Sequence, residues 1–247
     1  MTTFMDAVSQ RIASTIKALL IASVVLSALY GFNRINFTRH FPIKNVQVYG
    51  VNRVDKQEMQ SLLEPLVNRG FFTVNVEYVR DRLMQMPWVA YTSVRRDWPD
   101  RLEVIVVEKT PVARWNDQSL LSETGELFSP KQETYPLGLA TFKGPEGQQI
   151  VMLEYYKEIN RLLVPLHARI STLELTPYAT WKFTLDNGVA LQAGHKDVLT
   201  RLDHFVKVYP KIVASREADV EYVDLRYPNG MAIRWKTQAA ANSKVEE

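Results

Sequence analysis

The histidines are the residues of this chain best suited to metal binding or acid–base catalysis, and their spacing supports neither. Imidazoles bind zinc when two or three meet, as in an HExxH helix, and act as general bases beside a nucleophile. No such spacing occurs, and there is no cysteine to act as a nucleophile or thiolate ligand. The four are His40, His167, His195 and His204. We interpret each as a surface or partly packed residue.

The glycine and carboxylate patterns also do not predict catalysis. Gly144-Pro145-Glu146-Gly147 resembles neither a Walker loop nor GxGxxG, and Pro145 removes an amide donor that a phosphate cradle needs. No GxSxG motif is present, and the carboxylates are dispersed. The sequence therefore predicts a protein that is not an enzyme and that uses no metal or cofactor.

The tryptophans are the remaining candidates for a functional surface, through peptide or glycan binding. Trp88 and Trp181 stand in strand-like segments, which favours packing in a core. Trp235 ends the last strand-like segment. A terminal strand is often an edge strand, whose free N–H and C=O groups can pair with another chain. We interpret Trp235 either as an anchor for such a partner or as a further core residue.

The composition is that of a folded protein without a nucleic-acid-binding surface. The 247 residues are 46% hydrophobic, and they leave room for one large or two small domains. The net charge is only +3, from 30 basic and 27 acidic residues that are interspersed without a basic cluster. The lack of cysteine excludes disulfides and agrees with an oxidising compartment without requiring one.

Residues 12–33 are predicted to be a single transmembrane helix after a cytoplasmic tail, residues 1–11. Lys17 is the only charge between Ile12 and Phe32, and this stretch covers about 31 Å, close to a bilayer core of about 30 Å. A cleaved signal peptide is the alternative, but the stretch is long and no small-x-small cleavage site follows it. Basic residues flank both ends, so charge alone does not set the orientation, and a short tail left in the cytoplasm is the simpler topology.

Residues 41–110 are predicted to form a compact α+β module of order β-α-α-β-β. A valine-rich strand ending near Gly50 leads to a helix with Asp55 as its N-cap, and a second helix begins after Asn75. Two strands follow: 88–95 and 102–108. Both helices are expected on one face of the three-stranded sheet.

Residues 111–236 are predicted to form a mixed, mainly antiparallel β-domain with flanking helices. A disordered polar tail, residues 237–247, follows it. Within this domain, the pattern predicts one strand over 115–121 and a loop over 136–147.

Two hairpins are predicted near the end of the β-domain. Asn187-Gly188 stands between two alternating segments and is typical of a two-residue hairpin turn. Pro228-Asn229-Gly230 joins the last two strands, 222–227 and 231–235.

An ordered set of segments resembles the FtsQ/DivIB family of bacterial cell-division proteins over nearly the whole chain. No single motif is decisive, but the ordered set is specific. Its main members are Phe41-Pro42-Ile43, Met86-Pro87-Trp88-Val89, Val94-Arg95-Arg96-Asp97-Trp98-Pro99, Gly125-Glu126-Leu127-Phe128, Tyr209-Pro210 and Tyr222-Val223-Asp224-Leu225-Arg226-Tyr227.

The resemblance implies a single-pass type II protein of the inner membrane at the division septum, with a cytoplasmic N-terminus, a periplasmic POTRA domain and a β-domain. It implies an essential, non-enzymatic divisome scaffold that recruits the FtsB–FtsL pair, with FtsB adding a strand to the last β-strand. Other division proteins are expected on the POTRA domain. Carried over to this chain, the partner-binding residues are Arg226, Tyr227, Asn229, Gly230, Met231, Ile233 and Trp235, together with Tyr222 and Asp224.

Two departures from the family bear on this site. Pro228 stands in the last turn, where it stiffens the entry to the final strand. Relatives can carry arginines just before the position of Trp181, but this chain has Tyr178-Ala179-Thr180 there. A charge contact to an acidic partner helix is therefore missing or rebuilt elsewhere.

Two other classes of protein fit parts of the pattern. One is a POTRA-type module that handles unfolded polypeptides for secretion or outer-membrane assembly, although such systems usually carry several modules or a membrane barrel. The other is a periplasmic enzyme acting on cell wall, which lacks a recognisable catalytic constellation here.

Overall fold

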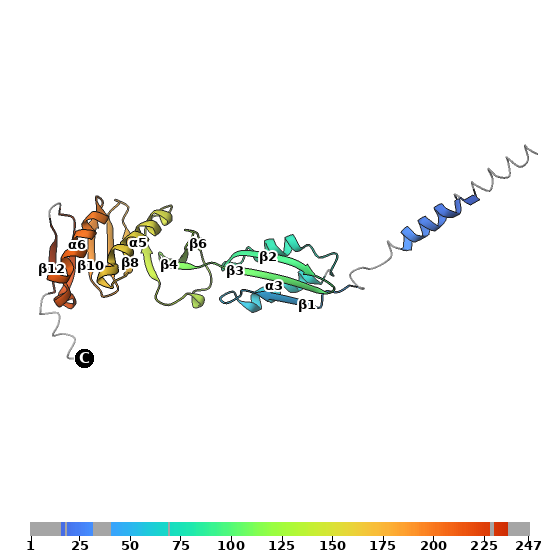
Figure 1. Ribbon diagram of the computed structural model, residues 1–247, viewed down its shortest axis with the longest axis horizontal. Helices are drawn as coiled ribbons and strands as arrows, with labels where there is room; N and C mark the ends of the chain where they lie inside the picture. The colour runs from blue at the N-terminus through green and yellow to red at the C-terminus, as the bar shows by residue number, and fades with distance from the viewer. Residues whose placement is uncertain (1–15, 18, 32–40, 69, 228–229, 237–247) are drawn as a thin grey trace, which may run out of the picture. The chain divides into compact units, whose positions relative to one another are not determined.

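The computed structural model describes residues 16–17, 19–31, 41–68, 70–227 and 230–236 (Figure 1). Residues 16–17 and 19–31 are helical. Across these described ranges, no helix is long and apolar enough to cross a membrane. Four predictions lie wholly or partly outside the described residues: the cytoplasmic tail, the ends of the span, Asn229 and the C-terminal tail.

The chain divides into two compact units, Met1–Gln85 with Tyr91–Val107, and Met86–Ala90 with Glu108–Glu247. The three-stranded sheet has the order β1-β3-β2, with β1 parallel to β3. The predicted β-α-α-β-β order is confirmed. The elements are β1 (Asn45–Tyr49), α3 (Lys56–Val67), α4 (Val76–Leu83), β2 (Val89–Asp97) and β3 (Arg101–Glu108).

One face of this three-stranded sheet is covered by both helices. On β3, Leu102, Val104 and Val106 are buried, whereas the intervening Ile105 and Val107 are exposed. Successive strand residues point to opposite faces, so the covered face is the one that carries the buried set. The helices supply the matching apolar side chains Met59, Leu63, Val79 and Leu83, all buried.

Helix α3 begins where its capping residue predicts. Asp55 Oδ1 accepts hydrogen bonds from the backbone N–H groups of Gln57, at 2.9 Å, and Glu58, at 3.2 Å. These amides have no partner inside the first turn of a helix, so the side chain replaces water at the N-terminus.

Replacing Asp55 with alanine should lower the free energy of unfolding of the first unit by about 1 kcal/mol, because the two amides lose their acceptor. Urea unfolding of the full chain, followed by hydrogen exchange in peptides from α3, measures this loss. Asp55→Asn keeps an acceptor oxygen and should retain most of the stability. A loss as large in the asparagine variant as in the alanine variant would contradict the capping role.

The second unit contains a nine-stranded sheet of order β12-β11-β10-β9-β8-β7-β4-β5-β6 (Figure 1). Its strands are β4 (Pro111–Trp115), β5 (Ser119–Ser122), β6 (Leu127–Phe128), β7 (Ala140–Lys143), β8 (Ile170–Leu175), β9 (Trp181–Leu185), β10 (Ala190–Gly194), β11 (Val220–Asp224) and β12 (Ala232–Trp235). Its helices are α5 (Gln149–Leu163), α6 (Val198–Ile212) and the 3₁₀ turns η1 (Gln132–Thr134), η2 (Val164–Leu166) and η3 (Ala214–Asp219).

Both long helices lie on one face of this sheet. α5 joins the parallel strands β7 and β8, and α6 joins the parallel strands β10 and β11. Both connections step in the same direction along the sheet, so right-handed crossovers place both helices on the same side. The two helices pack against each other, as Figure 1 also shows.

A row of apolar side chains crosses the sheet under these helices. The strand registers align Phe142, Leu173, Phe183, Leu191, Val223 and Ile233. The neighbouring row, on the opposite face, is mainly polar: Thr141, Thr172, Thr184, Ala190, Tyr222 and Arg234. The sheet therefore has one face in the core and one toward solvent.

Trp88 and Trp181 are core residues, as predicted, at 4% and 5% exposed. The Trp88 indole Nε1 donates to Thr134 Oγ1 at 3.0 Å, so its polar edge is satisfied although buried. The Trp181 ring stacks on Tyr155, with 4.3 Å between ring centroids.

Three local predictions for the second unit are wrong. Residues 115–121 are not one strand, because Asn116 and Asp117 take positive φ values of 46° and 60° and turn the chain between β4 and β5. The segment 136–147 is not only a loop, because it contains the short strand β7. This strand pairs with β4 on one side and with β8 on the other, and both are distant in the sequence. The first strand of the last hairpin ends at Asp224 and does not reach Tyr227.

Candidate protein-interaction edge

The last strand, β12, is an edge strand. Within residues 230–236 and the rest of the described chain, it pairs with β11 and with no other strand. The Lys236 N–H donates to Asp219 C=O at 2.7 Å and so points toward the β11 side. Amides of successive strand residues point to opposite edges, so Ala232 and Arg234 also face β11 while Ile233 and Trp235 face outward.

The geometry of β11 agrees with this assignment. The Leu225 N–H donates to Gln192 C=O at 2.9 Å, so this amide faces β10. Asp224 and Tyr222 therefore face β12, where they stand opposite Ala232 and Arg234. The backbone groups of Ile233 and Trp235 consequently form the open side of the sheet, which can accept a further strand.

The side chains of Met231, Ile233 and Trp235 lie on the core face of the sheet. All three are half-buried and pack against the apolar core of the second unit. They fix the position of β12 and leave only their outer surfaces for a partner. This edge therefore offers a partner main-chain hydrogen bonds more than side-chain contacts.

Trp235 already has one neighbour on its ring. The Arg216 guanidinium from η3 lies 4.5 Å from the ring centroid, within range of a cation–π contact. Arg216 also pairs with Asp219, with 3.3 Å between Nε and Oδ2. The ring is therefore held in place, which lowers the entropy that a partner must remove on binding.

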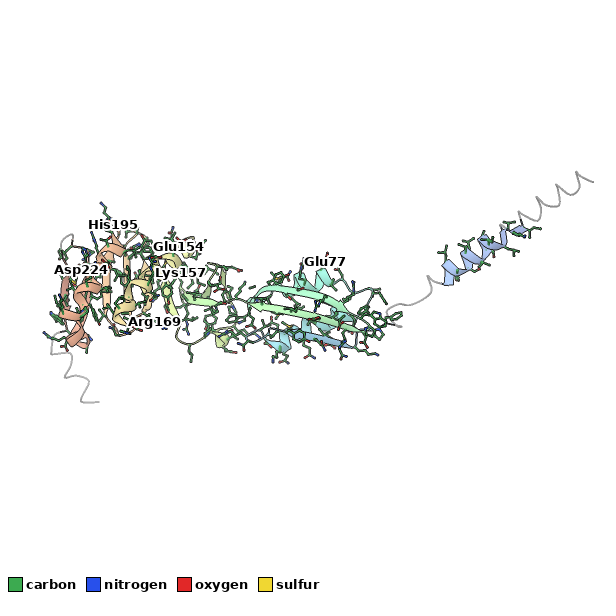
Figure 2. The ribbon with its side chains drawn as sticks, in the orientation of Figure 1. Glu77, Glu154, Lys157, Arg169, His195 and Asp224 are labelled. Carbon is green, nitrogen blue, oxygen red and sulfur yellow. The ribbon has the colours of Figure 1, made fainter. Side chains whose placement is uncertain are left out.

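Asp224 is not a surface contact, because its carboxylate is buried and held by Arg226. It lies at the β12 end of the unit (Figure 2) and is 5% exposed. Arg226 Nη2 and Nε donate to its two oxygens at 2.6 and 2.9 Å, and the Arg226 N–H donates to Oδ1 at 2.9 Å. These hydrogen bonds hold the pKa of Asp224 below its ordinary value, although burial by itself would raise it.

The Asp224–Arg226 pair should be insensitive to pH across the neutral range. The pKa of Asp224 is lowered by folding, so its contribution is complete above the unfolded value of about 3.9 and is lost as the pH falls through the folded value. A ¹³C carboxyl titration of the full chain should therefore place its midpoint below about 3.9.

In Arg226→Gln the pKa of the same carboxyl should rise, because the guanidinium hydrogen bonds that lower it most are gone while burial remains. An unchanged midpoint in that variant would show that Arg226 does not set the pKa.

Tyr227, Gly230 and Met231 meet around a cavity of about 200 Å³ beside the open edge. Tyr227 is 55% exposed, and a side chain at Gly230 would meet open space. The remaining lining residues come from α6 and from the end of β11: Arg201, His204, Val208 and Leu225. The cavity has both apolar walls, such as Val208 and Leu225, and a cationic one, Arg201.

The sequence reasoning missed two residues of this edge. Arg234 alternates with Ile233 and Trp235, so its side chain lies on the solvent face, where it pairs with Glu221 at 3.1 Å. Strand alternation alone could have identified it. Arg216 could not be found in this way, since it reaches Trp235 from a separate 3₁₀ turn.

Among the residues that the structure describes, no three histidine or carboxylate side chains lie close enough together to hold a metal ion. His167, His195 and His204 are described and His40 is not.

Comparison with known proteins gives two family matches. A POTRA domain of FtsQ type matches residues 41–109, and the C-terminal model of cell division protein FtsQ/DivIB matches residues 113–226. The second match ends before β12.

Individual relatives extend the similarity further. The chain is similar to cell division protein FtsQ of Coxiella burnetii, 33% identical over 228 residues, which cover 92% of this chain and 93% of that protein. It is 32% identical over 219 residues to FtsQ of Shewanella oneidensis, covering 88% and 83% of the two chains. It is 35% identical over 185 residues to FtsQ of Escherichia coli, covering 73% and 66%.

Proposed function

Because this chain belongs to the FtsQ/DivIB family of bacterial cell division proteins, we propose that it is a non-enzymatic divisome scaffold that captures FtsB, and with it FtsL, by strand addition to β12. The observation that carries this proposal is the open edge of β12, with the Ile233 and Trp235 backbone groups facing outward. An added strand satisfies these groups and gains about 0.5–1.5 kcal/mol net for each hydrogen bond.

The partner-binding residues divide into three roles under this proposal. Ile233 and Trp235 supply main-chain pairing. Tyr227, Gly230 and Met231 offer the neighbouring cavity to a partner side chain. Arg226 presents a cation that is 57% exposed, and the buried Asp224 holds it in position. Asn229 remains a proposed contact on the turn.

We further propose that residues 12–33 anchor the protein in the inner membrane, with residues 1–11 in the cytoplasm and both units in the periplasm at the septum. Support comes from the apolar sequence of this stretch and from the helical conformation of residues 16–17 and 19–31. A fluorescent fusion should form a ring at midcell. Uniform signal around the envelope would instead favour polypeptide handling in secretion or outer-membrane assembly.

Photo-crosslinking in living cells tests the binding edge directly. A photoreactive amino acid at Tyr227, Met231 or Trp235 should capture FtsB, identified by mass spectrometry. The same group at Lys143, which is exposed on β7 in the interior of the sheet, is the matched control and should capture far less. Equal capture from Lys143, or none from the three edge positions, would overturn the proposal.

Trp235→Ala should weaken binding of a peptide from the periplasmic part of FtsB by about 1–2 kcal/mol, because the ring is an ordered aromatic at the open edge. Isothermal titration calorimetry with the full chain in detergent measures the change. Arg216→Gln removes the cation above the ring while keeping the tryptophan, and it should cost less. Unchanged affinity in a folded Trp235→Ala variant would remove this residue from the interface.

A further inference from the structure

The first unit has an unpaired edge of its own. Within the described residues, β1 pairs in parallel with β3 and has no strand on its other side. Alternate N–H and C=O groups of Asn45–Tyr49 are therefore available on the open side. This edge belongs to a different unit from β12, so the inference below does not depend on the proposed function.

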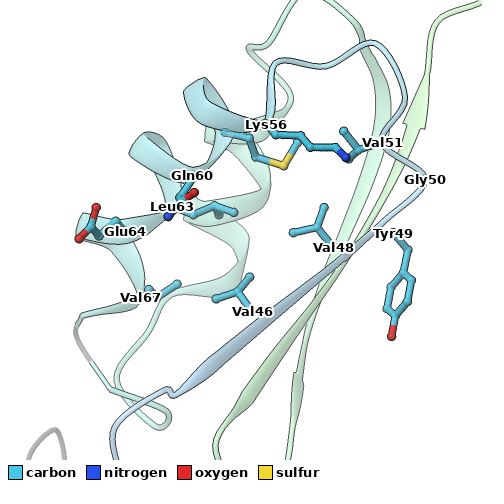
Figure 3. A pocket seen from close by; sticks show the side chains of 11 residues that line it. Val46, Val48, Tyr49, Gly50, Val51, Lys56, Gln60, Leu63, Glu64 and Val67 are labelled. Atoms are coloured by element: carbon cyan, nitrogen blue, oxygen red, sulfur yellow. The ribbon is translucent and has the colours of Figure 1, made fainter.

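A groove runs between this free edge and α3 (Figure 3). Its volume is about 730 Å³. Val46 and Val48 point from β1 toward the helix and are only half-buried, and Tyr49 points away from it. The lining is completed by Met59, Leu63 and Val67 from α3 and by Val51, which follows β1. An apolar groove beside an open strand edge has both features that bind an extended peptide, main-chain pairing and pockets for alternate side chains.

Two charges of opposite sign border the groove. Lys56, in the first turn of α3, reaches toward Val51 at one end, whereas Glu64 lies nearer the Val67 end (Figure 3). Neither side chain has an ion-pair or hydrogen-bond partner among the described residues. A bound chain can complement both charges without displacing an ion pair between described residues.

The spacing of the two charges defines the complementary sequence. Lys56 and Glu64 are eight positions apart on α3, which is about 12 Å at ~1.5 Å per residue. The same distance along an extended chain is about four residues at ~3.3 Å each, and residues four apart point to the same face. The groove therefore matches an acidic, an apolar and a basic residue at alternate positions.

We propose that the β1–α3 groove binds an extended segment of a partner polypeptide as a fourth, antiparallel strand. Its groove-facing side chains are an acidic residue near Lys56, an apolar residue over Val48 and a basic residue near Glu64. Antiparallel pairing is chosen because its hydrogen bonds are the more stable per residue.

Two synthetic peptides test the proposal by fluorescence anisotropy with the full chain in detergent micelles. One peptide, Thr-Thr-Asp-Thr-Val-Thr-Lys-Thr-Thr, has the complementary order, and the other exchanges Asp and Lys. The wild-type protein should prefer the first by about tenfold. Lys56→Glu should reduce or reverse that preference, because it changes the sign of the charge at one end.

Three further variants locate the site. Val48→Asp should weaken binding of the first peptide by about tenfold, whereas Val107→Asp should not, since Val107 lies on the opposite face of the same sheet and is 50% exposed. Ile233→Pro on β12 should also leave this binding unchanged. Thermal unfolding checks that each variant is folded. If Val48→Asp does not fold, Lys56→Glu still tests the site.

The proposal is overturned by any of three results. One is that the wild-type protein binds neither peptide. Another is that it binds both equally and Lys56→Glu changes nothing. The last is that Val107→Asp or Ile233→Pro weakens binding as much as Val48→Asp. None of these results bears on FtsB capture, which is measured separately at β12.

Discussion

Replacing Ile233 with proline is expected to weaken capture of the FtsB segment by about a hundredfold or more while the second unit stays folded. The Ile233 amide faces the open edge and makes no bond within the sheet, so its loss costs the isolated protein little. For an added strand the same change removes one hydrogen bond and places the proline ring where the partner backbone must lie.

Ile233→Ala is the matched control for this prediction. It truncates the half-buried side chain but keeps the N–H, so it should reduce stability through lost packing and retain most of the affinity. Calorimetric titration of both variants with the FtsB peptide, beside their melting temperatures, separates the two effects. If the proline and alanine variants bind equally well, the partner does not pair with this backbone.

The two edges of the nine-stranded sheet differ in what they can bind. β6 consists of Leu127 and Phe128 only, and such a short edge strand offers little backbone for pairing. β12 is longer, and its side chains pack firmly enough to hold it extended. This asymmetry explains why strand addition is assigned to one end of the sheet and not to the other.

Local signals predicted the elements that depend on neighbouring residues in the sequence. Asp55 caps α3, and Asn187-Gly188 turns between β9 and β10, because both rely on contacts within a few residues. The short strand β7 was missed because its stability comes from β4 and β8, which lie far away in the sequence. An isolated run of four residues gives no periodic pattern from which to predict such pairing.

The candidate site shows the same division between local and distant information. The family resemblance grouped Met231, Ile233 and Trp235, and these alternate residues share the core face of the sheet in the structure. Burial of Asp224 was not predictable, since it depends on β11 lying between β10 and β12 in the sheet. Sequence reasoning therefore grouped Asp224 with surface contacts, whereas its carboxylate is enclosed and holds Arg226.

Gly50→Ala is expected to destabilise the first unit strongly. Gly50 has φ +80°, which costs an L residue roughly 1–2 kcal/mol. A Cβ there would also lie 2.0 Å from the backbone oxygen of Val106, so β1 and β3 would have to move apart. We expect the free energy of unfolding to fall by about 3 kcal/mol, which is roughly 12–24 °C in melting temperature for a unit of this size.

Gly188→Ala separates the two causes of this loss. Gly188 has a similar φ of +89°, but a Cβ there meets open space, so only the backbone conformation is penalised. Hydrogen exchange of peptides from β1 and β3, and from β9 and β10, reports each unit separately in the full chain. Gly50→Ala adds the collision with Val106 to the backbone penalty. It should therefore lower the free energy of unfolding of its unit by clearly more than Gly188→Ala lowers that of the second unit. Equal losses would mean that the sheet accommodates the extra carbon beside Val106 and that backbone conformation alone requires glycine at position 50.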